Sequence, residues 1–507
     1  MKKNELKFFN LQFMVLLFFA LMICNFFNGD VMAKKIEFKG KTNIGKIKLP
    51  GSFEYDAKKD IYKITGSGEN IWGKEDAFYY VWNKVEGDLS LTMSYKWIGK
   101  GHVLHRKGGW MIREGLDADA PYVDALIHGD GLISMQYRLT KGGDTYEVQS
   151  KINDPDATVQ LDKTGDQYTM YVIGKDQKIH PAGTITVELK GQLYSGLVVT
   201  SHDSTNVETA LFSNVDQKIL GVIDSDKRVV ESSLEIMDVE TGVRTLVRRS
   251  KEHFEAPNWS RDGKYFIYNS GGKIYTLPVK GGKPELLNTG FANKCNNDHG
   301  ISPDGKEFVI SHHGGPDGNS MIYILPINGG VPKLVTEKSP SYWHGWSPDG
   351  KTLAYCAERN NNYDVYTIPV AGGEETRLTT AEGLDDGPDY SPDGQYIYFN
   401  SVRTGQMKIW KMKADGSDQI QITPDDEYGD WFAHPSPDNK WLVFISFDKS
   451  VEGHPANKNV ALRMMPVSGK EIKVVAKLFG GQGTINVPSW SPDSKKFAFV
   501  SYRLVQP

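Results

Sequence analysis

The amino-acid sequence predicts an all-β protein, and three observations lead to this prediction. Glycine and proline are frequent, with 52 and 24 among 507 residues, and 11% of the residues are aromatic. This composition is typical of short strands joined by tight turns. Apolar and polar side chains alternate in short segments of residues 35–218, and a turn sequence recurs through residues 234–507. We therefore expect two β-rich parts in a chain long enough for more than one domain.

The overall composition excludes several classes of protein. Charged residues make up 24% of the chain and hydrophobic residues 39%, so neither a disordered chain nor a polytopic membrane protein is expected. The formal net charge of −4 provides no general basic surface for phosphate groups. Nucleic acid is therefore not an expected partner.

The first 33 residues have the pattern of an export signal. Three lysines precede an apolar run at 13–24, which is too short for an ordinary membrane span. Small residues near Ala33 favour cleavage there, so the sequence predicts a signal peptide over 1–33 and no transmembrane segment after its removal. The mature protein is expected to be periplasmic or secreted. Lipidation of Cys24, which would anchor it in the outer membrane, is the alternative.

Two cysteines, Cys295 and Cys356, would remain after removal of the signal. So few cysteines cannot form a disulfide framework, and both parts of the mature protein must be stable through their hydrophobic cores. Two buried thiols are favoured over a single bridge.

Residues 35–218 contain strand-like segments between Gly and Asp turns, which predict a sandwich of two β-sheets. The order of the segments resembles the concanavalin A-like jelly-roll domains of bacterial carbohydrate-active proteins. The resemblance implies sugar binding or packing against a catalytic partner. Trp72 and Trp110 are among the tryptophans that could stack on sugars, although a place in the core is favoured. Residues 219–233 are short and partly apolar, which predicts a linker between docked domains.

A recurring turn divides residues 234–507 into similar units. Its consensus, Ser-Pro-Asp-Gly, suits a type I turn in which Pro sets φ, Asp bonds to nearby backbone and Gly eases the exit. The serines of the copies are Ser260, Ser302, Ser347, Ser391, Ser436 and Ser491. Their spacing of about 44 residues matches one four-stranded propeller blade. The last interval is longer because of the segment 447–459.

The two ends of the repeat predict how the propeller closes. Strands at 234–239 and 244–247 precede the first turn, and one strand at 496–502 follows the last. Pairing of these N- and C-terminal strands would complete a sixth blade and leave no free edge. The expected fold is therefore a jelly-roll sandwich at 35–218 followed by a six-bladed β-propeller at 234–507.

The propeller sequence resembles a known family. Trp-Ser-Pro-Asp-Gly, an aromatic-rich strand, an Ile-Tyr-x-x-Pro strand and a Gly-Gly turn are similar to the TolB-type propellers of exported bacterial proteins. The resemblance covers residues 234–507. It implies that the propeller face binds a protein partner in the envelope.

Departures from the repeat indicate where a site would lie. Proline usually stands three residues before the serine of the turn, but two adjacent blades have His299 and His344 at this position. Equivalent positions in neighbouring blades direct these side chains toward a common volume at the channel mouth. With Asp298 and His434 they could bind a divalent metal such as Mn²⁺, Zn²⁺ or Ca²⁺, and no organic cofactor is expected. The alternatives are a general base without a metal and a solvated channel.

Further side chains could contact a substrate at the same mouth. Arg359 and Arg403 occupy matching positions in neighbouring blades, and such a pair could bind carboxylate groups, with ordinary surface ion pairs as the equal alternative. Trp343, Trp431 and Phe432 could stack on sugar rings, and Asp386 could accept hydrogen bonds from hydroxyl groups.

Together these patterns predict an exported carbohydrate-active protein that holds a polysaccharide or oligosaccharide, expected to be acidic, at the propeller mouth. A polysaccharide lyase would use His299 or His344 as the base of a metal-assisted β-elimination, a chemistry suggested by resemblance to propeller-fold oligogalacturonate lyases. A glycoside hydrolase would use Asp298, Asp386 and Asp430. The alternative is a non-enzymatic TolB-like scaffold that binds an envelope protein. Whether the protein is an enzyme is left open at this stage.

Overall fold

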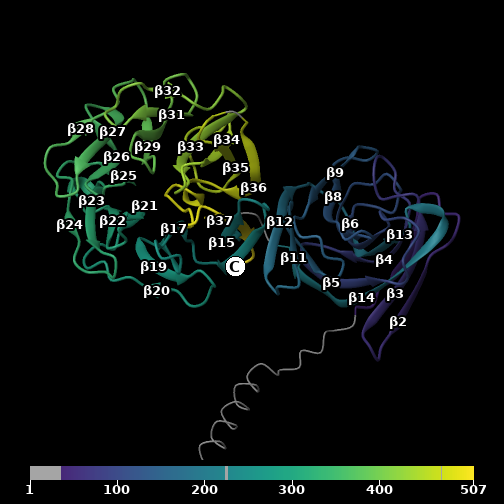
Figure 1. The fold of residues 1–507 in the computed structure, drawn as a ribbon. Coiled ribbons are helices and arrows are strands. Elements are labelled where there is room, and N and C mark those ends of the chain that lie inside the picture. The colour runs from purple at the N-terminus through teal and green to yellow at the C-terminus, as the bar shows by residue number, and fades with distance from the viewer. Residues whose placement is uncertain (1–35, 223–226, 470) are drawn as a thin grey trace, which may run out of the picture.

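A computed structural model describes residues 36–222, 227–469 and 471–507. The predicted export signal at 1–33, including Cys24, lies outside the described residues. The regular elements of the described part are strands, with short 3-10 turns such as Pro316–Gly318 and Gln482–Thr484. Figure 1 shows two β-rich bodies side by side. No helix in these ranges is long and apolar enough to cross a membrane.

The N-terminal body consists, over the described residues, of two antiparallel sheets of seven strands each. In spatial order the first sheet contains β1 (Gly40–Ile44), β4 (Phe78–Val85), β13 (Leu193–Thr200), β6 (Lys107–Arg113), β7 (Tyr122–His128), β8 (Ile133–Arg138) and β9 (Thr145–Gln149). The second contains β12 (Ile179–Thr186), β11 (Gln167–Ile173), β10 (Thr158–Thr164), β5 (Asp88–Trp97), β14 (Asp203–Gly221), β3 (Ile61–Gly68) and β2 (Ser52–Asp56). The jelly-roll type of this pair of sheets stays a prediction.

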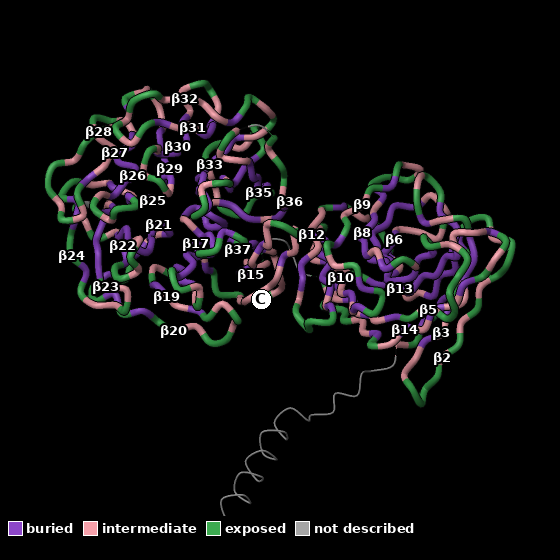
Figure 2. Tube along the Cα trace, viewed as in Figure 1, coloured by how far each residue is buried: buried purple, intermediate pink, exposed green. Residues whose placement is uncertain are grey.

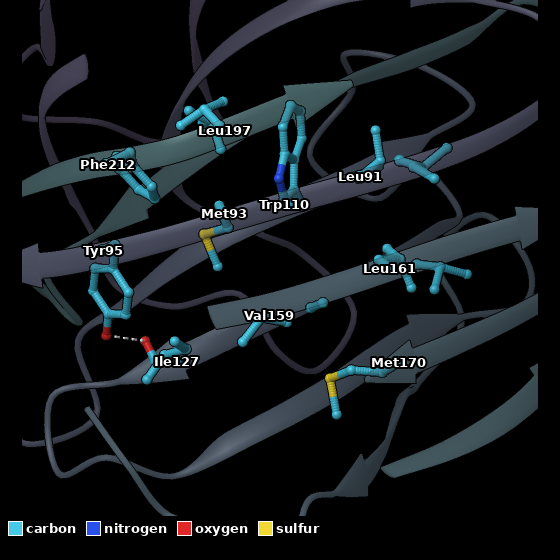
Figure 3. Close-up of a cluster of buried hydrophobic side chains, with 14 of the residues drawn as sticks. Leu91, Met93, Tyr95, Trp110, Ile127, Val159, Leu161, Met170, Leu197 and Phe212 are labelled. Carbon is cyan, nitrogen blue, oxygen red and sulfur yellow. Dashed lines mark hydrogen bonds between the residues drawn. The ribbon is translucent and has the colours of Figure 1, made fainter. Parts of the chain in front are cut away.

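The two sheets share one hydrophobic core. Every second side chain of β5 is buried, as the alternation of Leu, Met and Tyr with Ser and Thr requires. Figure 3 shows Trp110 of the first sheet among Leu91 and Met93 of the second. The Tyr95 hydroxyl crosses between the sheets and donates a hydrogen bond to the Ile127 carbonyl at 2.8 Å. Trp110 is thus a core residue, whereas Trp72 is 40% exposed.

The C-terminal body is a β-propeller, formed in the described residues by five four-stranded sheets and one three-stranded sheet. Blade 1 contains β17 (Glu255–Trp259), β18 (Tyr265–Ser270), β19 (Lys273–Pro278) and β20 (Glu285–Leu286). Blade 2 contains β21 (Cys295–Ile301), β22 (Glu307–His312), β23 (Met321–Pro326) and β24 (Lys333–Leu334), and blade 3 contains β25 (Ser341–Trp346), β26 (Thr352–Arg359), β27 (Asn362–Pro369) and β28 (Thr376–Arg377). Blade 4 contains β29 (Asp385–Tyr390), β30 (Tyr396–Ser401), β31 (Lys408–Lys413) and β32 (Ile420–Gln421), and blade 5 contains β33 (Tyr428–Pro435), β34 (Trp441–Asp448), β35 (Lys458–Pro466) and β36 (Lys473–Gly480).

The propeller closes as predicted. The C-terminal strand β37 (Lys496–Val505) pairs with β15 (Val229–Asp238), which in turn pairs with β16 (Arg244–Ser250). A single bridge between Trp490 and Phe497 stands where the other blades have a full inner strand. Because each end of the repeat supplies part of the same blade, this closure hides both strand edges.

The predicted turn explains the connection between the first two strands of each blade. In blade 3 the Ser347 hydroxyl donates a hydrogen bond to Asp349 Oδ1 at 2.6 Å and accepts one from the Thr352 amide at 2.9 Å. Gly350 has a φ of +70°, which other residues adopt at a cost. The inner strands that these turns follow are buried, and the short outermost strands are largely exposed (Figure 2).

The two bodies dock through paired charges. Arg503 of β37 lies 2.6 Å from Asp162 of β10, and Arg228 lies 2.7 Å from Asp88 of β5. β12 lies beside β36 and the sixth blade in Figure 1. β14 extends to Gly221, so strands take up much of the segment that was predicted to be a linker. Cys295 and Cys356 are both buried and free, as expected.

Candidate functional site

The inner strands of the propeller enclose cavities at both of their ends. The cavity at the starts of the strands has a volume of about 530 Å³ and is called here the mouth pocket. It is lined by Glu255, Asn296, Asn297, Asp298, His313, Tyr342, His344, Cys356, Tyr363, Leu384, Asp386, Phe432, His454 and Gln482. A smaller cavity of about 240 Å³ lies at the turn side, among Trp and Pro residues that flank the repeated turns. The polar and titratable groups are concentrated in the mouth pocket.

An ion pair between neighbouring blades occupies the mouth pocket. His344 Nε2 of β25 lies 3.1 Å from Asp386 Oδ1 of β29, and both side chains are almost fully buried. The Gly387 amide donates a hydrogen bond to the same oxygen at 2.7 Å. Gly387 has a φ of +61°, and a Cβ there would collide with the Phe432 ring, so glycine is required beside this carboxylate.

The pair holds its two members in their charged forms. Burial raises the pKa of Asp386, but the charge of His344 and its hydrogen bond outweigh burial and lower that pKa to about 2. Burial likewise lowers the pKa of His344, but the carboxylates of Asp386, Asp298 and Asp389 outweigh it and raise that pKa. His344 Nδ1 is buried and lacks a hydrogen-bond partner in the described part of the chain.

Asp298 of β21 supplies a second carboxyl group of a different character. It accepts hydrogen bonds from the side-chain amides of Asn296 at 2.8 Å and Asn486 at 3.1 Å. Burial, with a further contribution from the charge of Asp386, raises its pKa to about 6, although His344 partly offsets the shift. One carboxyl group of the pocket therefore stays ionised while the other titrates near neutral pH, a separation typical of acid–base sites.

Aromatic and histidine side chains of blade 5 cover the ion pair. Phe432, which has a φ of +53°, stacks on His344 with ring centroids 5.7 Å apart. His454 comes from the long segment 447–459, and its Nε2 lies 4.0 Å from Asp386 Oδ2. Phe432 was predicted as a stacking residue at the mouth, and it lines the pocket, whereas His454 was not identified from the sequence. The extra length of the last interval of the repeat was the sequence signal that could have led to His454.

The structure brings together only part of the predicted metal set. Asp298 and His344 line the mouth pocket, but His299 is fully buried outside its lining, where burial lowers its pKa to about 4. His434 bonds to Asp389 at 3.0 Å and to the Ile485 carbonyl at 3.1 Å. Within the described ranges no group of three or more His, Cys, Asp or Glu side chains is arranged to hold a metal. The predicted donors therefore do not fit a single metal site.

The predicted substrate arginines also lie elsewhere than expected. Arg359 is held 2.9 Å from Glu375, and Arg403 is held 2.7 Å from Asp385. Neither lines the mouth pocket, because each guanidinium turns toward a carboxylate of its own blade. Both arginines therefore form ion pairs, which was the alternative prediction for them.

The predicted aromatic platforms are buried as well. Trp343 packs against Gly300 and lines the turn-side cavity, and Trp431 lies in the core of blade 5 with its ring 4.4 Å from that of His454. Of the predicted substrate-binding residues, Asp386 and Phe432 line the mouth pocket.

Comparison with known proteins identifies the propeller. The model of the TolB beta propeller domain matches residues 318–459. The uncharacterized protein Atu1656 of Agrobacterium fabrum is 52% identical over 274 residues, which cover 54% of this chain and 93% of that protein. The chain belongs to the family of TolB-type β-propeller proteins. A solved structure described as "putative TolB from Agrobacterium tumefaciens" is 52% identical, covers 54% of this chain and 99% of its own, and has a TM-score of 0.53.

Two more distantly similar proteins have names that state a function. The Tol-Pal system protein TolB of Francisella tularensis is 26% identical over 255 residues, which cover 49% of this chain and 56% of that protein. An oligogalacturonate lyase in complex with manganese is 13% identical, covers 55% of this chain and 98% of its own, and has a TM-score of 0.36. A likeness at this level carries no argument for a shared activity.

Proposed function

We propose that this TolB-type protein is exported and binds the end of an oligosaccharide in the mouth pocket. The observation that carries the proposal is the convergence of carboxyl, amide, imidazole and aromatic side chains from several blades around a cavity of about 530 Å³. Concave sites with a few convergent polar groups and aromatic walls are typical of small-ligand binding. Carboxylates and amides suit sugar hydroxyl groups, and Tyr342 and Phe432 offer apolar ring surfaces.

An acidic glycan is the less suitable form of this ligand. No Lys or Arg lines the mouth pocket among the described residues, and the two arginines expected to bind carboxylates are paired with Glu375 and Asp385. A uronate group would meet Asp298 and Asp386 without a cation to compensate it. A neutral or basic glycan is therefore favoured over the acidic one expected from the sequence.

The pocket also contains the groups that proton transfer requires. Asp298, with a pKa of about 6, can donate a proton, and the His344–Asp386 pair lies in the same cavity. We propose that turnover is hydrolysis of a glycosidic bond: Asp298 protonates the leaving glycosidic oxygen, water adds to the anomeric carbon, and the proton that water loses restores Asp298. Incubation with neutral and basic oligosaccharides, followed by chromatography of the products, tests this step. Recovery of every oligosaccharide intact would restrict the function to binding.

Binding is tested by glycan-array screening followed by titration calorimetry of the full mature chain. Tyr342→Ala should weaken binding about tenfold, because it removes a ring surface on which the sugar packs. His105→Gln, at an exposed histidine of the N-terminal body, is the control and should bind as the native protein does. Equal binding by all three proteins would place the glycan outside the mouth pocket.

A protein partner is the second candidate, and family membership favours it. The Tol-Pal system protein TolB of Francisella tularensis is among the relatives of this chain, and the segment 447–459 places His454 at the rim of the same pocket. Affinity capture from envelope extracts, with native protein and with a variant whose 449–457 segment is replaced by a short Gly-Ser linker, tests this candidate. A partner lost with the segment supports it, and identical captures from both proteins contradict it.

A further inference from the structure

The mouth pocket has an excess of negative charge. Three carboxyl groups line it, those of Glu255, Asp298 and Asp386, whereas His344 is the one base in its described lining that is paired with a carboxylate at hydrogen-bond distance. His344 compensates Asp386, and Glu255 has His253 Nε2, which is outside the pocket lining, at 3.5 Å; Asp298 is left without a matched cation. His454, the other histidine near Asp386, has its pKa lowered by burial and is neutral near pH 7.

The hydrogen bonds of Asp298 leave room for a stronger donor. Its partners are the neutral amides of Asn296 and Asn486, and the amide of Asn297 donates to Glu255 at 3.4 Å. Hydrogen bonds from neutral amides stabilise a buried carboxylate less than those from a charged donor. Asp298 therefore stays partly protonated near neutral pH, and a cation placed in the pocket would favour its ionised form.

We propose that the group held in the mouth pocket is a protonated primary amine, so that the glycan is one that contains unacetylated hexosamine. This inference rests on the proposed function. An ammonium group offers three donors in a compact volume, which matches carboxylates reached from different blades. Tyr342, Tyr363 and Phe432 provide ring surfaces for the apolar face of the same sugar.

The amine also agrees better with the described side chains than a metal or a carboxylate does. A divalent metal would need several free donors, but His344 and Asp386 are bonded to each other, and no set of metal-ligating side chains is arranged for it within the described ranges. A carboxylate would add negative charge to a pocket in which the charges of Asp386 and Glu255 already contribute to the raised pKa of Asp298. An ammonium group relieves that repulsion without requiring several free metal-ligating donors.

The test compares two tetrasaccharides that differ only in acetylation. Titration calorimetry of the mature protein at pH 6.5 is performed with the glucosamine tetramer and with the fully N-acetylated tetramer. The amino form should bind at least tenfold more tightly, because one charge-assisted contact changes affinity by about this factor. Equal affinity would overturn the amine inference and leave the glycan proposal intact. Binding of neither tetramer, nor of any sugar on the array, would overturn both.

A substitution tests where the amine binds, and a lysine-containing peptide tests whether the amine comes from a protein and not from a sugar. Asp298→Asn keeps the shape of the side chain and one of the two oxygens that accept hydrogen bonds from Asn296 and Asn486, so it should lose the tenfold preference and leave binding of the acetylated tetramer unaffected. Glu285→Gln, at an exposed position of β20, is the control and should keep the preference. A preference unchanged in Asp298→Asn would overturn the assignment. Tighter binding of a lysine-containing peptide than of the amino tetramer would also overturn it, in favour of a protein ligand.

Proton release gives a second measurement of the same contact. Asp298 faces Asp386, His344 and Glu255 from three other blades, and an ammonium group beside it should lower its pKa. Binding near pH 6 should then release a proton, which appears as a dependence of the calorimetric enthalpy on the ionisation enthalpy of the buffer. Asp298→Asn should remove this dependence. The same dependence in both proteins would contradict the placement of the amine at Asp298.

Discussion

Replacement of Asp386 by Asn tests the ion pair at the centre of the mouth pocket. Asn has the same shape and can still accept the hydrogen bond from the Gly387 amide, so the change removes chiefly the charge. Folding lowers the pKa of Asp386 from 3.8 to about 2, a difference that corresponds to about 2 kcal/mol of stabilisation by the ionised form. This contribution is present above pH 4 and is lost as pH falls through about 2.

The pKa of His344 sets the highest pH at which the ion pair stabilises the folded protein. That pKa is raised in the folded state, so the stabilisation by the charged imidazole is complete below about pH 6.5 and is lost as pH rises through the folded-state value. Asp386→Asn should therefore destabilise the propeller by about 2 kcal/mol at pH 5.5 and by clearly less at pH 9. Hydrogen exchange in increasing urea, read on peptides of β25 and β29, measures this difference. An equal loss at both pH values, or a loss below about 0.5 kcal/mol at pH 5.5, would refute the reasoning.

Three further changes test the packing around the pocket. Gly300→Ala would place a Cβ 1.9 Å from the Trp343 ring, so we expect destabilisation of about 1–3 kcal/mol by calorimetry, and an unchanged melting temperature would contradict the contact. Burial raises the pKa of the Cys356 thiol, so this thiol should resist iodoacetamide at pH 8 in the folded protein and react only after unfolding. Rapid labelling of the folded protein, detected by mass spectrometry, would show that the thiol is accessible. His344→Pro restores the usual residue of the repeat, as in Pro388, and should keep the fold. A circular dichroism spectrum of an unfolded chain would show that His344 is needed for structure.

The propeller fold could be predicted because the same turn sequence recurs in each blade. Each Ser-Pro-Asp-Gly turn uses local hydrogen bonds, such as those from Ser347 to Asp349, and local interactions do not depend on the rest of the fold. The closure by β15 and β37 followed from the two incomplete ends of the repeat. The site was harder to predict, because Arg359 and Arg403 meet carboxylates that the turns bring to them from other strands, and their free or paired state is a tertiary property.

The two histidines show why symmetry between blades was a partial guide to the site. His299 and His344 are equivalent in the repeat, yet His299 pairs in the ladder with Ile310, whereas a register shift between Trp343 and Gly345 leaves His344 outside the pairing. An extra residue in one strand re-aims the side chains beside it. The register of β33 likewise shifts between Trp431 and His434, where Phe432 lies.

The same irregularity recurs at the other strands that form the pocket. Asp298 lies within the shift between Cys295 and His299, and Asp386 lies at the start of the shift between Asp386 and Asp389. A regular strand directs alternate side chains to its two faces and cannot bring neighbouring positions into one cavity. The bulges relax that alternation at one end of each inner strand, while the turns at the other end keep the repeat. The propeller can therefore conserve its blade architecture at the turn side and carry different side chains, and a different ligand, at the mouth.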